Sequence, residues 1–414
     1  MDFLNILSTS LIIFTCACFS YEILYLILPI FRKIRHSGAS KPTRYAILIA
    51  ARNEETVLPH LLESIRSQDY PAELLTTYVI ADNCTDRTAA VAAQHGARVF
   101  QRFNTTQVGK GYALNYLLEQ IRIAGDMEKY DAFLIFDADN LLQPDYVTQI
   151  NKVRSDGYEV FCGYRNSKNF GSSWVSSGHA IWYLHESTHL NQSRMIMGNC
   201  CTVSGTGFGF TRQLLERLGG WNFFTLTEDI EFRTWCATHG VRIGYSHDAV
   251  LFDEQPETFA LSVRQRTRWV QGGIQVSLRY WRDYLKGIFR GGRTAWASFE
   301  SATQSIWGYG LSAACFLCRM LVILLASRWM GVVEALLLTA VTGYVSIFIA
   351  GVLTVAAEHH RILATRKEKF LSLFTYPLYV FSYIPIAVLA VFRKPEWKPI
   401  AHTVAVPISR MQNM

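Results

Sequence analysis

The stretch Ala132-Phe-Leu-Ile-Phe-Asp-Ala-Asp-Asn140 places five apolar residues directly before two carboxylates. A short continuous apolar run is typical of a strand that is buried on both faces of a parallel sheet. Tyr45 to Ala51 and Leu74 to Ala81 have the same character, and Ala97 to Gln101 is a further short strand. Because parallel strands need crossover connections, this pattern predicts an α/β domain with a mostly parallel sheet.

Segments with helical spacing separate these strands: Glu55 to Gln68, Thr85 to His95 and Gly109 to Ile123. Sheets of this kind bind ligands at the carboxyl ends of their strands. Polar clusters follow three of the predicted strands, namely Arg52-Asn-Glu-Glu55, Asp82-Asn-Cys-Thr-Asp86 and Asp137-Ala-Asp139. The sequence therefore predicts that the three clusters form one site.

Asp137-Ala-Asp139 is the clearest chemical feature of the chain. In an extended strand end, residues two apart point the same way, so both carboxylates can approach one cation. A Mg²⁺ or Mn²⁺ ion bound to a diphosphate needs only one or two protein carboxylates. The alternative is a solvated acidic turn, and the position directly after an apolar strand favours the metal site.

Three further segments each have a binding and a structural interpretation. Asp82 and Asn83 suit a nucleobase or ribose, or cap the helix that follows. Lys110, which lies between two glycines at a helix start, suits an anion or is an ordinary surface lysine. The segment Ser204-Gly-Thr-Gly-Phe-Gly209 permits close approach of a ligand, or is a sharp entry into a strand.

The segment Thr227-Glu-Asp-Ile-Glu231 begins a helix, with Thr227 as the predicted cap and acidic residues in the first turn. This arrangement alone explains the helix. A carboxylate placed here can also act as the base that removes a proton from an acceptor hydroxyl.

A basic and aromatic helix follows, in which helical spacing brings Gln265, Arg268 and Trp269 together. One interpretation is an amphipathic helix on the membrane surface, with Trp269, Trp281 and Tyr284 as interfacial anchors. The other gives Arg268 to a diphosphate and Trp269 to a sugar ring, because a guanidinium suits phosphate and an indole face suits sugar C–H groups.

The apolar residues concentrate at the two ends of the chain. Four runs are long enough to span a bilayer: Leu4 to Ile30, Gly308 to Ala326, Gly331 to Ala357 and Leu371 to Phe392. The first opens with Met-Asp and precedes Arg32, Lys33 and Arg35, so it is an anchor rather than a cleaved signal peptide. These basic residues place the following domain in the cytoplasm, at the plasma membrane. The last run, which contains Pro377 and Pro385, is either a span or an interfacial segment.

Other classes of protein fit less well. The nine cysteines form no disulfide framework, and Cys315 and Cys318 lie in an apolar run without a second metal-binding pair. The net charge of +7 comes largely from basic residues beside apolar segments, which fits a membrane surface better than nucleic acid.

The polar motifs occur in a characteristic order: Arg52-Asn-Glu54, Asp82, Lys110, Asp137-Ala-Asp139, Thr227-Glu-Asp229 and Gln265-x-x-Arg268-Trp269. This series resembles the family 2 inverting glycosyltransferases, specifically the membrane-embedded processive polysaccharide synthases such as cellulose, chitin and hyaluronan synthases. The resemblance covers about Ala46 to Gly273. It implies a GT-A fold, a UDP-sugar donor and Mg²⁺ or Mn²⁺.

The resemblance also implies roles for individual residues. Asp229 is the expected general base, Arg268 stabilises the departing diphosphate, and Glu228 is the third expected catalytic residue. Asp139, together with Asp137, holds the metal. The expected substrate-binding residues are Arg52, Asn53, Glu54, Asp82, Lys110, Asp137, Gly205, Thr206, Gly207, Gln265 and Trp269. Asn83 departs from the pattern, since many relatives carry a second aspartate there.

The expected organisation is a transmembrane anchor (1–31), a cytoplasmic GT-A domain (40–257), amphipathic interface helices (258–305), a transmembrane region (306–392) and a basic tail (393–414). The leading functional expectation is a processive β-glycosyltransferase that builds a polysaccharide, with export left open. The alternatives are a single-addition transferase with a membrane-lipid acceptor, and a non-catalytic nucleotide-binding or transport protein. Membrane lipids are expected partners, nucleic acid is not, and an oligomer is compatible with the sequence but unsupported by it.

Overall fold

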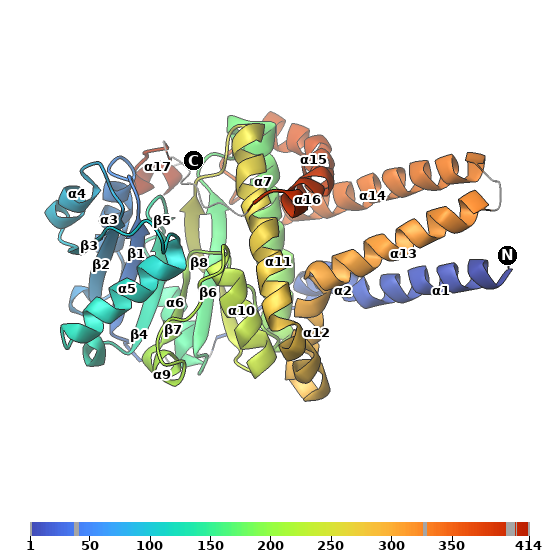
Figure 1. Cartoon of the computed structure of the whole chain (residues 1–414). Coiled ribbons are helices and arrows are strands. Elements are labelled where there is room, and N and C mark those ends of the chain that lie inside the picture. Colours follow the sequence, from blue (N-terminus) through green and yellow to red (C-terminus); the bar gives the residue numbers. More distant parts are fainter. Residues whose placement is uncertain (1, 37–40, 326–328, 395–401, 403, 413–414) are drawn as a thin grey trace.

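The computed structural model describes residues 2–36, 41–325, 329–394, 402 and 404–412. The predicted domain start at residue 40, the predicted span end at Ala326 and part of the basic tail lie outside these residues. An eight-stranded sheet with the strand order β3-β2-β1-β4-β7-β6-β8-β5 forms the centre of the polar domain (Figure 1).

The sheet is mixed and mostly parallel. Its strands are β1 (Tyr45–Ala51), β2 (Leu75–Asp82), β3 (Arg98–Arg102), β4 (Ala132–Asp137), β5 (Leu141–Leu142), β6 (Val160–Ser167), β7 (Phe208–Thr211) and β8 (Ile243–Asp253). The pairs β1–β2, β1–β4, β2–β3 and β6–β8 are parallel. The short β7 is antiparallel to both β4 and β6, and β5 is antiparallel to β8. This arrangement confirms the predicted α/β fold class.

Helices cover both faces of the sheet. Alternate β1 side chains enter different cores: Leu48 packs in the core with α5 (Lys110–Ile123), whereas Ile47 packs in the core with α3 (Leu58–Arg66). The remaining helices of this domain are α4 (Thr88–Gln94), α6 (Tyr146–Ser155), α7 (Trp174–His185), a π-helical turn (Glu186–Asn191), α8 (Gln192–Met197), α9 (Arg212–Arg217) and α10 (Glu228–His239). Short 3₁₀ turns occur at Ala72–Leu74, Met127–Lys129 and Phe170–Ser172.

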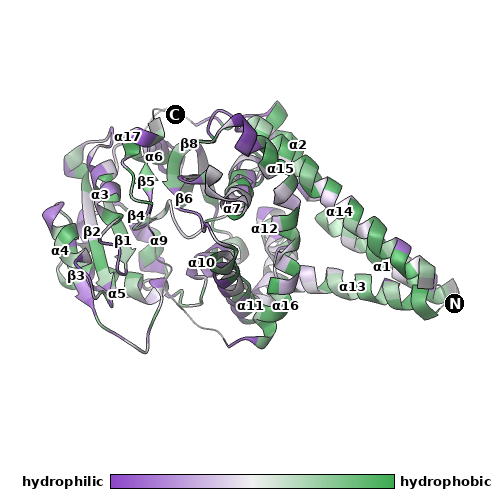
Figure 2. Ribbon diagram, turned by 90° about the horizontal axis from the view of Figure 1, so that it is seen from above, coloured by the Kyte–Doolittle hydropathy of each residue, from purple (hydrophilic) through white to green (hydrophobic). Residues whose placement is uncertain are grey.

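The other helices include the most apolar ones of the chain, such as α1, α13 and α14 (Figure 2). They are α1 (Asp2–Phe19), α2 (Tyr21–Phe31), α11 (Phe259–Phe289), α12 (Gly292–Thr303), α13 (Ile306–Leu325), α14 (Trp329–Ala357), α15 (Arg366–Phe381), α16 (Tyr383–Phe392) and α17 (Ile408–Gln412). Within the part of the chain that the structure describes, four stretches are long and apolar enough to cross a membrane: Phe3–Phe31, Ile306–Leu325, Met330–Ala357 and Arg366–Phe392. Helices α1, α13 and α14 extend together from one side of the polar domain (Figure 1).

The last apolar stretch is broken rather than continuous. Helix α15 ends at Phe381 and α16 begins at Tyr383, and the two pack against α7 and α11 of the polar domain. The buried guanidinium of Arg266 donates to the backbone oxygen of Tyr379 at 3.1 Å and to the hydroxyl of Ser382 at 2.8 Å. This packing favours the interfacial alternative for the segment.

A buried polar network joins α2 to the polar domain. Arg194 of α8 and Glu300 of α12 form an ion pair at 2.5 Å, and both side chains are only 1% exposed. The hydroxyl of Tyr25 on α2 donates to the other oxygen of Glu300 at 3.0 Å, and Asn199 donates to it at 2.6 Å. Since each carboxylate oxygen has a donor, the buried charge is satisfied and the first apolar helix is fixed in place.

Candidate active site

The end of β4 carries the two predicted aspartates. The backbone amide of Asp137 donates to Asn140 and to the hydroxyl of Thr206, both at 3.0 Å. Asp139 is 2% exposed, and its carboxylate accepts from the amide of Glu254 at 3.0 Å. The strand ends at Asp137 and a turn follows, so strand alternation does not set the directions of the two carboxylates, and their approach to one cation stays a prediction. The turn instead gives them different partners.

Lys110 lies at the first position of α5 and points into the site. Its ammonium forms an ion pair with Asp137 and donates to the backbone oxygen of Gly205 at 2.7 Å. Burial acts to lower the pKa of Lys110, but the carboxylates of Asp137 and Glu228 hold that pKa above its ordinary value. The lysine is therefore a fixed positive charge in the site rather than a solvated surface residue.

The glycine-rich segment before β7 passes close to α10. Gly205 has φ +79°, and a Cβ built there would lie 3.5 Å from a carboxylate oxygen of Asp229. Gly207 has φ +63°, and a Cβ there would meet the Leu251 side chain at 2.0 Å. Both positions favour glycine, because a side chain would be strained at this φ, and at Gly207 it would also clash with Leu251.

Two adjacent carboxylates lie in the first turn of α10. Glu228 is buried and Asp229 is half-buried. Burial, together with the charge of Asp229, raises the pKa of Glu228 to about 7. Burial also raises the pKa of Asp229, while Lys110 and Arg268 oppose that rise. A carboxylate with a raised pKa is better matched to proton transfer near neutral pH, which is what a general base requires.

Thr227 occupies the N-cap position of α10 as predicted, but it makes no capping hydrogen bond. Its hydroxyl has no hydrogen-bond partner among the described residues. Helix α11 lies directly against it, because a Cβ at Gly272 would come within 2.3 Å of the Thr227 hydroxyl. Tight helix packing, rather than a cap, therefore fixes the start of α10.

Helix α11 contributes the three predicted residues of its motif. Arg268 is half-buried, and its positive charge opposes the rise in the pKa values of Glu228 and Asp229. The Trp269 ring contacts His179 and Tyr183 of α7, with ring centroids 5.7 and 6.2 Å apart. The side-chain oxygen of Gln265 is buried without a partner among the described residues. The helix thus brings a cation, an indole and an open acceptor to one region.

The end of β2 holds Asp82 in a buried ion pair. Arg102, at the end of β3, donates to Asp82 at 2.7 Å, and both side chains are nearly inaccessible. Asn83 has φ +54° and exchanges hydrogen bonds with the backbone of Asn104, at 2.8 and 3.1 Å. Asn83 therefore fixes the loop after β3. Arg102 had no signal in the sequence, since only the parallel pairing of β2 and β3 places it beside Asp82.

The loop after β1 is tied to the loop after β2. Asn53, with φ +58°, accepts from the amide of Thr85 at 2.8 Å. The amide of Glu54 donates to the hydroxyl of Thr88 at 2.8 Å, and Glu54 is buried. Arg52 is half-buried in the same loop. The structure thus brings the polar clusters that follow β1, β2 and β4 to one edge of the sheet, as predicted from the strand ends.

The C-terminal segment reaches this edge, which the sequence did not reveal. The His402 ring contacts the carboxylate of Glu54 at 2.9 Å, and the amide of Val404 donates to Glu254 at 2.9 Å. Burial acts to lower the pKa of His402, but Asp139 and Glu54 raise it to about 10, so the ring is positively charged at neutral pH. Lys168 adds a second cation, through its contact with the backbone oxygen of Asp139.

The acidic residues at this edge fit a hard divalent cation. No cluster of three or more metal-binding side chains occurs among the described residues, so a cation here would share its ligands with a diphosphate. Asp139 and Asp137 supply the carboxylate oxygens that Mg²⁺ and Mn²⁺ prefer, and one or two such ligands suffice for a metal bound through phosphates.

Comparison with known proteins agrees with this geometry. Residues 42–272 match a family model described as "Glycosyltransferase like family 2". A β-monoglucosyldiacylglycerol synthase from Synechocystis sp. is 28% identical over 252 residues, covering 57% of this chain and 49% of that protein. A poly-β-1,6-N-acetyl-D-glucosamine synthase from Staphylococcus epidermidis is 28% identical over 240 residues, covering 57% and 56%. The chain thus matches about half the length of these relatives.

The fold also matches a solved structure. The mannosyltransferase PcManGT from Pyrobaculum calidifontis, in complex with GDP-Man and Mn²⁺, has a TM-score of 0.58 and 20% sequence identity. The match covers 94% of this chain and 99% of that one. At this identity the likeness concerns the fold, which is the mixed, mostly parallel GT-A sheet followed by apolar helices.

Proposed function

The chain belongs to the glycosyltransferase like family 2, and we propose that it transfers one sugar from a UDP-sugar to a hydroxyl group of a membrane lipid, with inversion at the anomeric carbon. The polysaccharide synthase reaction is the second candidate. In both cases the catalytic domain faces the cytoplasm, since Arg32, Lys33 and Arg35 follow the first apolar stretch.

The placement of α11 carries the proposal. This helix packs against α13 and α16, lies crosswise to the direction in which α1, α13 and α14 protrude (Figure 1), and carries Arg268 and Trp269. Farther along the same helix, the exposed apolar side chains are Leu278, Trp281, Leu285 and Phe289. If the three protruding helices cross the membrane, α11 lies along its surface, as an amphipathic helix does. The site then opens where lipid hydroxyl groups are found.

The acids of α10 provide the base. We assign proton removal from the acceptor hydroxyl to Asp229, because it is less buried than Glu228 and faces the glycine-rich segment at Gly205. The resulting oxygen attacks the anomeric carbon on the face opposite the diphosphate, so the bond to the diphosphate breaks as the new glycosidic bond forms. An α-linked donor would therefore give a β-glycoside.

The cations of the site act on the leaving group. Arg268 and Lys110 are placed to offset the negative charge that develops on the departing diphosphate, and one such preorganised donor contributes on the order of 3 kcal/mol. A divalent cation held by Asp139 and Asp137 would supply further charge neutralisation at the diphosphate. Asp82 and the loop from Arg52 to Glu54 are assigned to the nucleoside, at the ends of β2 and β1.

Two observations favour a lipid over a growing polysaccharide as the acceptor. In the described part of the chain the four apolar stretches are mostly exposed rather than packed around an interior, which favours a lipid acceptor over a polymer that needs an enclosed path. The β-monoglucosyldiacylglycerol synthase relative also favours a lipid acceptor. The poly-β-1,6-N-acetyl-D-glucosamine synthase relative keeps polymer synthesis as the second candidate.

The test uses the full chain, purified in detergent and supplied with Mg²⁺ or Mn²⁺. Diacylglycerol in mixed micelles is offered with each of a panel of UDP-sugars and one GDP-sugar, and nucleoside diphosphate release and product mass are measured. A product with one added hexose, formed only when lipid is present, supports the proposal. A long polymer formed without added lipid selects the second candidate. Absence of nucleotide release with every donor and acceptor overturns both.

A further inference from the structure

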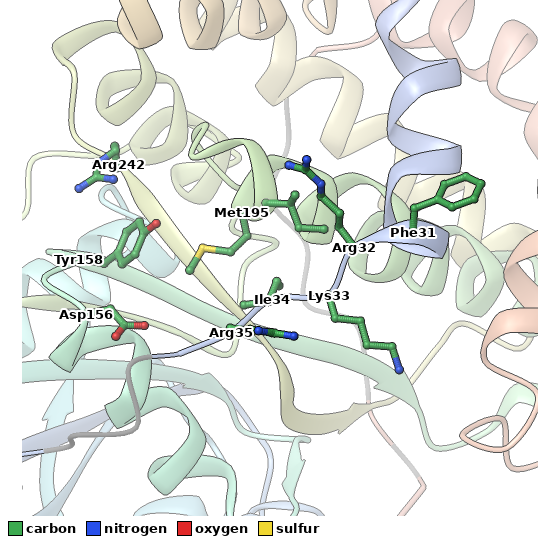
Figure 3. A pocket seen from close by; sticks show the side chains of 10 residues that line it. Phe31, Arg32, Lys33, Ile34, Arg35, Asp156, Tyr158, Met195 and Arg242 are labelled. Atoms are coloured by element: carbon green, nitrogen blue, oxygen red, sulfur yellow. The ribbon is translucent and has the colours of Figure 1, made fainter.

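A second pocket lies at the edge of the sheet opposite the active site (Figure 3). Its volume is about 540 Å³. Tyr158 and Arg242, which line it, come just before β6 and β8, whereas the active-site clusters follow the carboxyl ends of β1, β2 and β4. The pocket is therefore separate from the donor site.

Positive charge dominates the lining. Arg32, Lys33 and Arg35 come from the segment that follows α2, and Arg242 comes from the turn before β8. None of these four cations forms an ion pair with another residue in the described part of the chain. The single acid in the lining, Asp156, contacts the ring of His36 at 2.8 Å. The pocket thus has cations available for an anion.

The Arg242 side chain is held in position by a cation–π contact rather than by an ion pair. Its guanidinium lies over the Tyr158 ring, 4.9 Å from the ring centroid. A stacked guanidinium keeps its N–H donors at the edge of the plane, where they can bind the oxygens of a phosphate. A guanidinium offers several directional donors to one ligand, which favours a phosphate or phosphate ester over a halide.

An apolar surface continues from the rim of this pocket. Phe31 lines it, and is also the last residue of the first candidate span. Ile27, Ile30 and Phe31 of α2 are 42, 63 and 77% exposed, and Met197 at the end of α8 is 39% exposed. Cations directly beyond an apolar span lie at the depth of lipid headgroups.

We propose that this pocket binds the phosphate of an anionic phospholipid, whose acyl chains lie along the exposed face of α2. Bound lipid would fix the segment from Arg32 to Arg35 against the turn that carries Arg242. The site takes neither the sugar donor nor the acceptor, so it does not depend on the proposed reaction.

The test measures lipid binding rather than activity. The full chain in a zwitterionic detergent is titrated with short-chain phosphatidylglycerol, short-chain phosphatidylcholine and inorganic phosphate, and bound lipid is counted by native mass spectrometry alongside calorimetry. Each cation near a membrane surface contributes about a fivefold change in affinity. Arg35→Gln with Arg242→Gln should therefore weaken phosphatidylglycerol binding on the order of 30-fold. Phosphatidylcholine should bind equally weakly to both proteins.

A charge-matched control is Arg66→Gln with Arg122→Gln, since both arginines are exposed on other helices. Arg32→Gln with Lys33→Gln is the second pocket variant, and it decides the outcome if the first does not fold. Equal binding of phosphatidylglycerol and phosphatidylcholine would refute the proposal. Equal weakening of phosphatidylglycerol binding by the control variant would also refute it. If inorganic phosphate bound as tightly as the lipid, the pocket would instead be a site for a soluble anion, and the proposal would again be refuted.

Discussion

Replacing Arg194 by methionine should strongly destabilise the protein. The substitution keeps much of the side-chain volume but leaves the Glu300 carboxylate buried, with Tyr25 and Asn199 as its nearest donors. The nearest other cation, Arg233, is 3.9 Å away. Removing one partner of a buried ion pair costs about 3–5 kcal/mol, because the other charge stays buried without compensation.

A double-mutant cycle separates the ion pair from simple loss of packing. Glu300→Met alone should cost a similar amount, since Arg194 then keeps only neutral acceptors such as Thr202, at 2.8 Å. The double variant should cost much less than the sum of the two single variants, because no unpaired charge remains. Coupling of about 3 kcal/mol between the two positions is therefore expected.

The assay is thermal unfolding of the full chain in detergent, followed by tryptophan fluorescence. A chain of this size loses about 2 °C in Tm per kcal/mol, so each single variant should lose about 6–10 °C, and the double variant about as much as one single variant. The matched control is the exposed pair Glu119 and Arg122, whose removal should cost under about 1 kcal/mol. Additive losses, or a Tm for Arg194→Met that matches the control, would refute the role given to this network.

Three further outcomes follow from the active site. Acidification should lower kcat/KM, because burial raises the pKa of Asp229 and the base is lost as pH falls through that pKa. In a pH–rate profile, Glu228→Gln should remove any inflection near pH 7 and keep the fall in kcat/KM at lower pH. Gly205→Ala should lower kcat/KM about tenfold, since an L-residue at φ +79° is strained by about 1–2 kcal/mol beside Asp229; the same strain should lower Tm by about 2–4 °C, and steady-state kinetics well below Tm would check the loss of activity. His402→Ala removes a positive charge beside Asp139, so half-maximal activity should need several-fold less Mn²⁺; an unchanged metal titration would contradict that account.

The parallel half of the sheet was predictable because its strands are continuous apolar runs. Tyr45 to Ala51 matches β1 at both ends, the strand predicted from Leu74 to Ala81 is shifted by one residue from β2, and the strand predicted at Ala132 ends one residue before β4 does. The strands β6 to β8 were not predicted; β7 has only four residues, and two of them, Phe208 and Gly209, belong to the glycine-rich segment. Strand pairing of this kind is set by tertiary packing rather than by local pattern.

The site was predictable where residues follow strand ends, and hidden where contacts cross the chain. Asp82 and Asp137 lie at the predicted edge, because parallel strands bring their carboxyl ends together. Arg102 and Lys168 were missed, because each reaches the site through a fold-dependent contact. His402 lies 348 residues from Glu54 in sequence, and no motif marks it as a site residue.

Both interpretations of the α11 segment stay predictions, and the structure accommodates both. The charge of Arg268 acts on the acids of α10 and Trp269 packs against α7, while Leu278 and Phe289, farther along the helix, are exposed at 57 and 86%. A helix of 31 residues is about 46 Å long, so one end can serve the site and the other the membrane surface. Sequence periodicity alone did not separate these functions along its length.

The most direct test of the central claim is the rate of UDP release by Asp229→Asn, with the donor and lipid that give turnover in the wild-type protein. Loss of a general base predicts a fall in kcat of about 10²- to 10⁴-fold, with the KM for the donor nearly unchanged. Asp248→Asn, at a position 66% exposed and away from the site, is the matched control and should keep wild-type turnover. UDP release by Asp229→Asn at the rate of this control would contradict the assignment of Asp229 as the base.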